Sequence, residues 1–421
     1  MRQSPYIAIL IFTVIILIID LYTFHGFKKV NISLTKDVKR LLKVVFWIIP
    51  VIIVTGLISL VFFRSSVSPE KGMIVFNYFS GTFLLFYIPK LIFILFNILD
   101  DIFHLGKFTF FKLKSIKSNN SDSKKITRST FLTRSGIIIA GIPFLSIIYG
   151  IGWGRFNFIV RKSNISYPNL PKEFDGFKIV QISDFHLGSF LSNKDKVEEV
   201  VELVNAQNPD LILFTGDLVN NLASEVEPFI KSLSKLKAKY GMYSILGNHD
   251  YGEYVQWDSP EKKRENIDKL INLQESVGFK MMMNESEKIT IGNSSISLIG
   301  IENWGLPPFP QYGDLNKALE NVEQSDFKIL MSHDPTHWDA QVVEKTNIDL
   351  TLSGHTHGAQ FGIEIPGWRW SPVNLRYKQW GGIYKNNRQV INVNTGIGFI
   401  GFPGRIGMPP EVGFIQLKID N

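Results

Sequence analysis

The sequence of 421 residues contains no cysteine. This absence excludes disulfide bonds, catalysis by a thiolate and zinc sites with cysteine ligands. Acidic residues are scarce in one region: residues 1–165 contain 6 Asp and Glu against 21 Lys and Arg, a charge of +15, whereas the remaining 32 acidic and 24 basic residues give −8. The basic residues lie between apolar runs, a pattern typical of membrane topology, and we therefore predict no binding to nucleic acid.

Long apolar runs, by contrast, are abundant in residues 1–165. A helix needs about 20 apolar residues to cross a hydrocarbon core of about 30 Å. Asn77, Pro89 and Lys90 interrupt the third run, and the fourth is short enough to be a re-entrant segment instead. Asn77 and Lys90 are the interior polar groups that we count, too few for a transport pathway. We predict an all-α transmembrane region of about four helices, with spans at 6–24, 41–63, 73–99 and 137–153.

The distribution of Lys and Arg between these spans predicts the orientation in the membrane. Residues 25–40 and 100–135 together contain thirteen basic residues, whereas the segments on the other side contain six. Because basic loops stay in the cytoplasm, we expect a multi-pass protein of the cell membrane whose chain lies outside the cytoplasm after Trp153. The loss of one span, such as the interrupted third, would invert this orientation.

Residues 166–421 have a different pattern, in which short apolar strands alternate with charged helical stretches. This alternation is typical of an α/β domain. Residues 362–367 and 399–410 are rich in Gly and Pro and are expected to form hairpins and loops. Strands are predicted at 177–182, 211–214, 242–246, 328–331, 348–352 and 412–418, and helices at 194–206 and 225–239.

Polar side chains follow the ends of these strands. Residues two apart on an extended strand point the same way, so the carboxylate and imidazole of an Asp-x-His motif, or the two imidazoles of a His-x-His motif, can converge on one point. Such ligands, without thiolates, suit divalent manganese, iron or zinc. Each motif alone can be an ordinary turn, but five in succession favour a metal site. The residues are Asp184 and His186, Asp217 as a candidate bridge between two ions, Asn248, His249 and Asp250 in one turn, His333, and His355 with His357.

This series of motifs resembles the signature of the calcineurin-like metallophosphoesterases, in their bacterial membrane-linked branch. The resemblance covers the chain from about Phe177 to the C-terminus, and the membrane region is not part of the family's shared core. It implies a four-layer sandwich of two β-sheets flanked by helices, with a site for two divalent metal ions where the strands end. It also implies that Asp217 bridges the ions, that Asp184, His186 and His357 hold one, and that Asn248, His333 and His355 hold the other.

The same resemblance implies roles for two further residues of the turn. His249 is expected to be catalytic, by stabilising the transition state or protonating the leaving oxygen, and Asp250 to fix its tautomer. Asn220 stands where purple acid phosphatases carry a tyrosine ligand, so a tyrosinate-iron site is not expected. Arg405 is either a contact to phosphate or, more simply, a surface arginine.

These observations predict a membrane-anchored phosphoesterase with two metal ions. We expect it to hydrolyse phosphodiester or pyrophosphate bonds by attack of a metal-bound hydroxide, on lipid-linked or cell-envelope substrates. One alternative is a UDP-diacylglucosamine pyrophosphohydrolase of lipid A synthesis, whose substrate is cytosolic and conflicts with the expected orientation. Another is a non-catalytic metal-binding interaction module, although no ligand position has been lost. The native substrate, the metals and the oligomeric state stay open.

Overall fold

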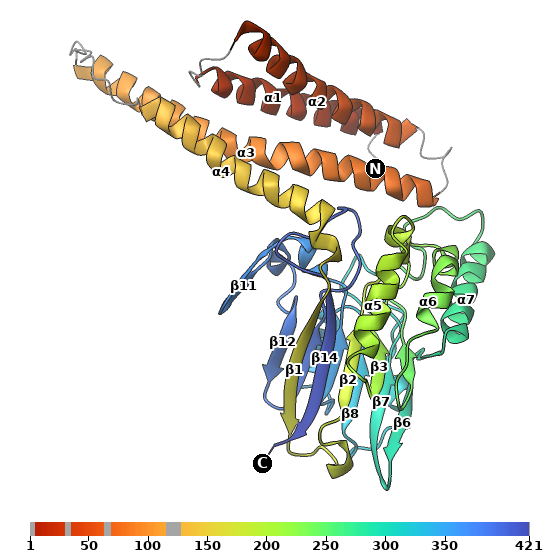
Figure 1. The fold of residues 1–421 in the computed structure, drawn as a ribbon. Coiled ribbons are helices and arrows are strands. Elements are labelled where there is room, and N and C mark those ends of the chain that lie inside the picture. The colour runs from red at the N-terminus through yellow and green to blue at the C-terminus, as the bar shows by residue number, and fades with distance from the viewer. Residues whose placement is uncertain (1–4, 30–34, 63–68, 115–127, 421) are drawn as a thin grey trace. The chain divides into compact units, whose positions relative to one another are not determined.

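The computed structural model describes residues 5–29, 35–62, 69–114 and 128–420. The chain divides into two compact units, Met1–Ile151 and Gly152–Asn421, drawn as a ribbon in Figure 1. The boundary that the sequence suggests after residue 165 falls inside a strand of the second unit, β1 (Ile159–Tyr167).

The described part of the first unit consists of long helices. Four of them are long and apolar enough to cross a membrane, as the sequence predicts; residue 63, the end of the predicted second span, lies outside the described residues. The third has 46 residues and continues past Pro89, so it is about 69 Å long and extends well beyond the predicted span. The helices are α1 (Pro5–Lys28), α2 (Lys36–Phe62), α3 (Pro69–Lys114) and α4 (Arg128–Gly152).

A buried ion pair joins two of these helices. The carboxylate of Asp20 on α1 is fully buried, and it accepts hydrogen bonds from the Lys90 ammonium group at 2.6 Å and from the Tyr87 hydroxyl at 2.7 Å, both on α3. A charge in an apolar bundle needs such partners, because desolvation alone is costly. The prediction that Asn77 and Lys90 are the interior polar groups of the spans is therefore wrong, because Asp20 is another.

The second unit is a mixed α/β structure. Its helices are α5 (Asp195–Asn205), α6 (Ile230–Leu233), α7 (Pro260–Ser276) and α8 (Leu315–Leu319). After β1, its strands are β2 (Lys178–Ile182), β3 (Leu211–Phe214), β4 (Met242–Ser244), β5 (Phe279–Met281), β6 (Glu285–Ile291), β7 (Ser294–Gly300), β8 (Lys328–Met331), β9 (Leu350–Ser353), β10 (Ile363–Ile365), β11 (Trp368–Trp370), β12 (Gly382–Asn386), β13 (Gln389–Val393) and β14 (Glu411–Ile419).

Two six-stranded sheets and a separate hairpin contain these strands. The sheets have the orders β1-β14-β2-β3-β4-β5 and β12-β13-β9-β8-β7-β6, and β10 pairs with β11 alone. Leu213 of the first sheet and Leu298 and Leu352 of the second are buried in one shared core. Helices cover the outer faces; in Figure 1, α5, α6 and α7 lie along the first sheet. The predicted four-layer sandwich of two sheets flanked by helices is confirmed.

The helices keep their place because each has one apolar face. On α5, Val197, Val200, Val201 and Val204 recur at the spacing of a helical face, and all four are buried in the core that this helix shares with the first sheet. Ser259 caps α7, since its hydroxyl accepts a hydrogen bond from the Lys262 amide.

The helix predicted at 225–239 is wrong. The structure has two short 3₁₀ turns there, followed by α6, which ends at Leu233. Pro228 has no N–H to donate within a helix. The carboxylate of Glu225 also accepts hydrogen bonds from the amides of Asn220, Asn221 and Leu222, which holds the chain in a compact turn.

Candidate metal centre

The predicted site residues follow strands that end at neighbouring positions. β2, β3 and β4 pair in parallel, as do β8 and β9, so within each set the carboxyl ends lie at the same edge of a sheet. The backbone beyond these ends is unusual. Non-glycine residues rarely have positive φ, yet five of the predicted ligands do: Asp184 (51°), His186 (50°), Asp217 (61°), His355 (73°) and His357 (51°). Sparsely populated backbone conformations concentrate at functional sites, where the surrounding structure holds them.

Three of the predicted ligands form a first group. The ligand atoms of Asp184, His186 and His357 lie within 4.8 Å of one another, and all three residues are buried. The Nε2 atoms of His186 and His357 are 3.0 Å apart, and His357 Nε2 is 3.3 Å from Asp184 Oδ1. Two imidazole nitrogens facing each other beside a carboxylate form a natural binding site for a cation.

A second group contains Asp217, His333 and His355, whose ligand atoms also lie within 4.8 Å of one another. His355 Nδ1 is 3.3 Å from His333 Nε2 and 2.8 Å from the Asn248 side-chain oxygen. Asn248 therefore joins this group, as the sequence predicts. All seven predicted ligand positions are brought together in these two groups.

Asp217 lies between the two groups. Its Oδ2 atom is 3.7 Å from His186 Nε2 in the first group and 3.2 Å from His333 Nε2 in the second. Its Oδ1 atom accepts a hydrogen bond from the His249 backbone amide at 2.8 Å. Asp217 is thus placed where a bridging carboxylate would be needed.

The protonation of the imidazoles fits metal binding. Burial lowers the pKa of His186 to about 3 and that of His355 to about 4. Burial, with the neighbouring charges of His186 and Arg405, also holds the pKa of His357 well below its ordinary value. These three rings are neutral at pH 7 and have a lone pair for a metal. Against the effect of burial, the carboxylate of Asp217 raises the pKa of His333 to about 10.

Groups distant in the chain orient two of the candidate ligands. His333 Nδ1 is 2.7 Å from the carbonyl oxygen of Thr215, which leaves Nε2 directed toward the second group. His355 Nε2 is 2.9 Å from the Tyr377 hydroxyl, which leaves Nδ1 for the same group. Ligating histidines commonly bond through their other ring nitrogen in this way. Neither partner has a sequence signal, because each is far from its histidine in the chain.

His249 lies beside the two groups and is not a member of either. Its ring is perpendicular to that of His186 at 4.9 Å between centroids and packs on Tyr254 at 4.4 Å. Its Nδ1 atom is 2.8 Å from the carbonyl oxygen of Asn220. Because a carbonyl only accepts, Nδ1 carries the proton and Nε2 is the atom that can exchange one. Burial lowers the pKa of His249.

The expected role of Asp250 is corrected by its contacts. One carboxylate oxygen accepts hydrogen bonds from the amides of Leu218 and Val219, and the other from those of Asp217 and Gly247, at 2.8–3.2 Å. Asn220, not Asp250, orients the His249 ring. Asp250 instead clamps its own turn onto the turn of Asp217, because both oxygens are engaged by backbone amides.

Arg405, which the sequence suggests to be a surface residue or a phosphate contact, is instead buried with 1% exposure. Its Nη2 atom donates to the carbonyl oxygens of Thr395 at 2.8 Å and Gly398 at 2.6 Å, and lies 3.2 Å from His357 Nδ1. The guanidinium group therefore fixes the loop behind His357 and is not available to a substrate.

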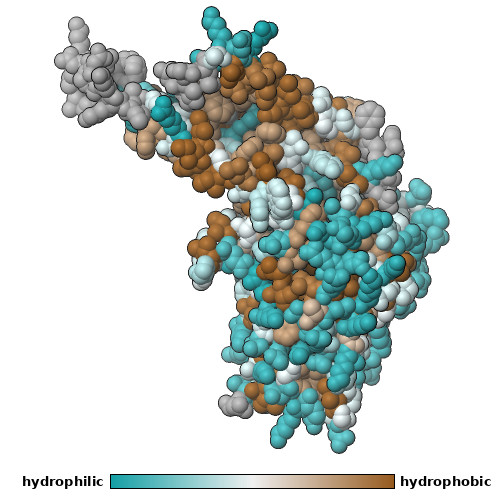
Figure 2. Space-filling view, viewed as in Figure 1, coloured by the Kyte–Doolittle hydropathy of each residue, from teal (hydrophilic) through white to brown (hydrophobic). Residues whose placement is uncertain are grey.

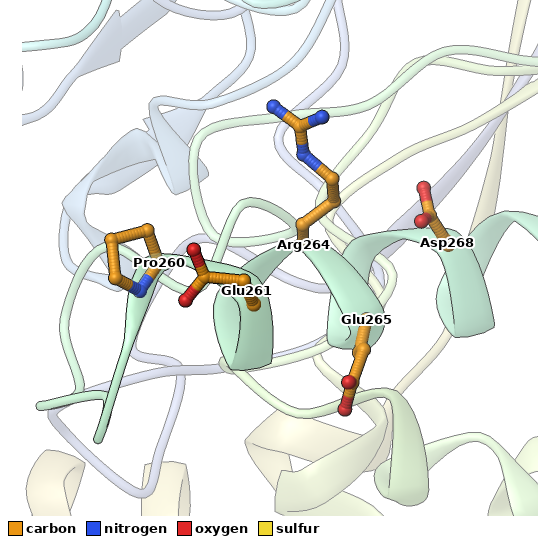
Figure 3. Close-up of a pocket in the computed structure, with 5 residues that line it drawn as sticks. All are labelled: Pro260, Glu261, Arg264, Glu265 and Asp268. Carbon is orange, nitrogen blue, oxygen red and sulfur yellow. The ribbon is translucent and has the colours of Figure 1, made fainter.

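A surface hollow at the start of α7 is separate from this centre. It is lined by Pro260, Glu261, Arg264, Glu265 and Asp268. Figure 3 shows Arg264 and Glu265 projecting from opposite sides of the helix rather than toward one point. The hollow thus has no converging set of ligands comparable to the metal centre.

Comparison with known proteins agrees with this arrangement. Residues 2–155 match the family model described as "Probable Calcineurin-like phosphoesterase, transmembrane domain", and residues 177–359 match "Calcineurin-like phosphoesterase". The chain is 30% identical over 314 residues to the metallophosphoesterase YkuE of Bacillus subtilis, covering 71% of this chain and 100% of that protein.

Two further relatives are also metallophosphoesterases or contain a metallophosphoesterase domain. A Helicobacter pylori metallophosphoesterase is 29% identical, covering 62% of this chain and 64% of that protein. A Danio rerio transmembrane protein with a metallophosphoesterase domain is 26% identical, covering 72% and 67%. The two metal-ligand groups, the membrane helices and these similarities lead to one conclusion: the chain belongs to the calcineurin-like metallophosphoesterase family and is a metal-dependent phosphoesterase with a transmembrane domain.

Proposed function

We propose that the protein hydrolyses phosphodiester or pyrophosphate bonds of lipid-linked or cell-envelope molecules, using two divalent metal ions. The observation that carries this proposal is the position of Asp217 between two groups of ligands. A single shared carboxylate allows two cations to bind close together, an arrangement that suits displacement at phosphorus.

The proposed ligands divide between the two ions as follows. Asp184, His186 and His357 would hold one ion, and Asn248, His333 and His355 the other, with Asp217 available to both. When bound, the ions would lower the pKa of a coordinated water and stabilise negative charge on the phosphoryl oxygens. Manganese, iron and zinc all suit these nitrogen and oxygen ligands.

His249 is the proposed catalytic residue outside the ligand groups. Its position beside His186 and the bond from Nδ1 to the Asn220 carbonyl leave Nε2 as the proton-exchanging atom. We assign it transfer of a proton to the leaving oxygen or stabilisation of the transition state. Asp250 supports it indirectly, by holding the turn that contains both Asn248 and His249.

A lipid-linked substrate and an extracytoplasmic site are the finer parts of the proposal. They are supported by the four apolar helices and by the excess of basic residues in segments 25–40 and 100–135. The chain has no native cysteine, so a single Asn387→Cys on the exposed β12–β13 turn would report the side directly. Labelling of intact cells by an impermeant maleimide supports an external domain, and labelling only after lysis contradicts it.

The activity is tested with the purified full chain and added manganese, on bis-p-nitrophenyl phosphate and p-nitrophenyl phosphate. We expect hydrolysis by wild type and a loss of roughly 10³-fold or more in Asp217→Asn. Asp268→Asn on the exposed surface of α7 is the matched control and keeps full activity. Equal activity of Asp217→Asn and wild type contradicts the two-ion site. Phospholipid phosphoesters in micelles, compared with soluble nucleotides, then test the substrate class.

A further inference from the structure

The β10–β11 hairpin has one polar and one apolar face. Its strands pair Ile363 with Trp370, Glu364 with Arg369, and Ile365 with Trp368. Directly paired residues share a face and neighbours along a strand alternate. The central pair therefore lies on one face, and the four apolar side chains lie on the other.

The polar face attaches the hairpin to the domain. Both carboxylate oxygens of Glu364 accept hydrogen bonds from Arg161 of β1, at 3.0 and 3.1 Å. Arg161 also binds Glu411 of β14 at 2.7 Å. The Arg369 guanidinium lies near Glu364 at 3.5 Å and over the ring of Trp380 at 4.9 Å. These contacts fix the orientation of the hairpin, so its other face is held outward.

The apolar face is exposed. Ile363 is 49% exposed, Ile365 54%, Trp368 51% and Trp370 36%. Figure 2 shows the hairpin as a hydrophobic projection on a surface that is otherwise largely hydrophilic around it. An outward, contiguous apolar face on a soluble domain indicates a partner surface, and tryptophan is the residue that favours the boundary between lipid and water.

The connection to the membrane region indicates which partner the apolar face of the hairpin contacts. The fourth candidate span ends at Phe156, and Arg161, which holds the hairpin, follows five residues later. Five residues reach at most about 18 Å, and the headgroup layer on each side of the hydrocarbon core is about 5–8 Å thick. The point at which the hairpin is attached is thus tethered close to the bilayer by the chain itself.

We propose that the β10–β11 hairpin inserts its apolar face, Ile363, Ile365, Trp368 and Trp370, into the lipid–water interface. The hairpin lies in the chain between the ligand His357 and Tyr377, which contacts His355, and Ser371 after β11 donates to the Gly358 carbonyl at 2.7 Å. Insertion of the hairpin therefore brings the segment between His357 and Tyr377, beside the metal centre, to the lipid surface. If the proposed function holds, a phosphoester carried by a lipid reaches the site without leaving the membrane.

The test uses the absence of native cysteine. Ile365→Cys and Trp368→Cys are made separately in the full chain, labelled with an environment-sensitive fluorophore and reconstituted into phosphatidylcholine–phosphatidylglycerol vesicles with or without nitroxide-labelled phospholipid. Both positions lie on the outward face, so the Glu364–Arg161 contacts remain. Asn293→Cys, on an exposed turn, is the control. The neighbouring Ser294 donates a hydrogen bond to Glu173, which follows the C-terminal end of β1. This end is about 30 Å from the start of that strand, so the control label lies far from the hairpin.

We expect nitroxide lipid to quench both hairpin labels about twofold or more and to leave the Asn293 label unchanged. Trp370→Asp in the Ile365→Cys background should remove this quenching, while Trp370→Phe retains it. Quenching of the hairpin labels no greater than that of the control overturns the proposal. A second result also overturns the proposal: the labels are shielded from aqueous iodide but are not quenched by nitroxide lipid, and the shielding is lost when added lipid dilutes the protein. This result indicates that the hairpin contacts a second copy of the chain. The readout requires no enzymatic activity, so it is independent of whether the proposed function is correct.

Discussion

Replacing Asp250 by asparagine is expected to destabilise the fold around the metal centre, and not only to disturb His249. The carboxylate accepts four backbone hydrogen bonds of 2.8–3.2 Å, two at each oxygen. Asparagine keeps one oxygen, so two of the four amide donors would face an NH₂ group. A buried donor without an acceptor costs about 1–3 kcal/mol, which gives about 2–6 kcal/mol for two.

The effect is measured by thermal unfolding of the full chain in detergent, with metal content determined in parallel. At about 2–4 °C per kcal/mol for a domain near this size, Asp250→Asn should lower Tm by roughly 4–24 °C and reduce retained metal. Asp268→Asn, an exposed aspartate on α7, controls for the change of charge and should unfold with wild type. An Asp250→Asn protein that keeps its Tm and both metals but loses turnover would refute this reasoning, and would restore the role of Asp250 as the partner of His249.

Three further outcomes are expected. His249→Ala should keep both metals and lower kcat by about 10²–10⁴-fold, whereas Asn248→Ala should lose one metal equivalent, both measured by metal analysis beside turnover; the same metal loss in both variants contradicts the proposed division of roles. A chelator should lower Tm of wild type reversibly, since ions at 100 times their Kd stabilise by about 2.7 kcal/mol, and an unchanged Tm argues against metal binding. Asp20→Ala should destabilise the membrane unit by about 3–5 kcal/mol, because it leaves Lys90 buried without its counter-ion. The double variant Asp20→Leu with Lys90→Met should recover most of this stability, measured by unfolding in detergent. Equal effects of the single and double variants contradict the importance of the pair.

The parts of the fold that the sequence predicts correctly are those with a strong local pattern. The apolar spans and strand β3 are continuous apolar runs, and β2, β8 and β9 are short buried strands with one or two polar residues each, so their local pattern identifies them directly. β1 is missed because the adjacent charged residues Arg161 and Lys162 interrupt the alternating pattern of a strand next to a span. The false helix at 225–239 has a charged, helix-like composition, but the hydrogen bonds of Glu225 to nearby amides prevail over that propensity.

The candidate metal ligands are predictable for a similar reason. Each of the seven lies two to four residues after β2, β3, β4, β8 or β9, and the carboxyl ends of neighbouring parallel strands lie at the same edge of a sheet. The groups that orient the candidate ligands and His249 are not predictable in this way. Thr215, Asn220 and Tyr377 act on histidines 118, 29 and 22 residues away in the chain, and two of these three contacts use a backbone carbonyl, which leaves no trace in the choice of side chain.

Arg405 shows how a general rule of composition fails at such a centre. Arginine is rarely buried, and a glycine-rich loop suggests exposure, so the sequence favours a surface position. In the structure the carbonyl oxygens of Thr395 and Gly398 face inward and need donors, and a guanidinium group is the side chain that supplies several at fixed angles. Burial holds the pKa of His357 well below its ordinary value, and the neighbouring charges of His186 and Arg405 lower it further. Burial of Arg405 therefore satisfies the carbonyl groups of the loop and places a positive charge beside the candidate ligand His357, and neither effect is visible until the loop is folded against the site.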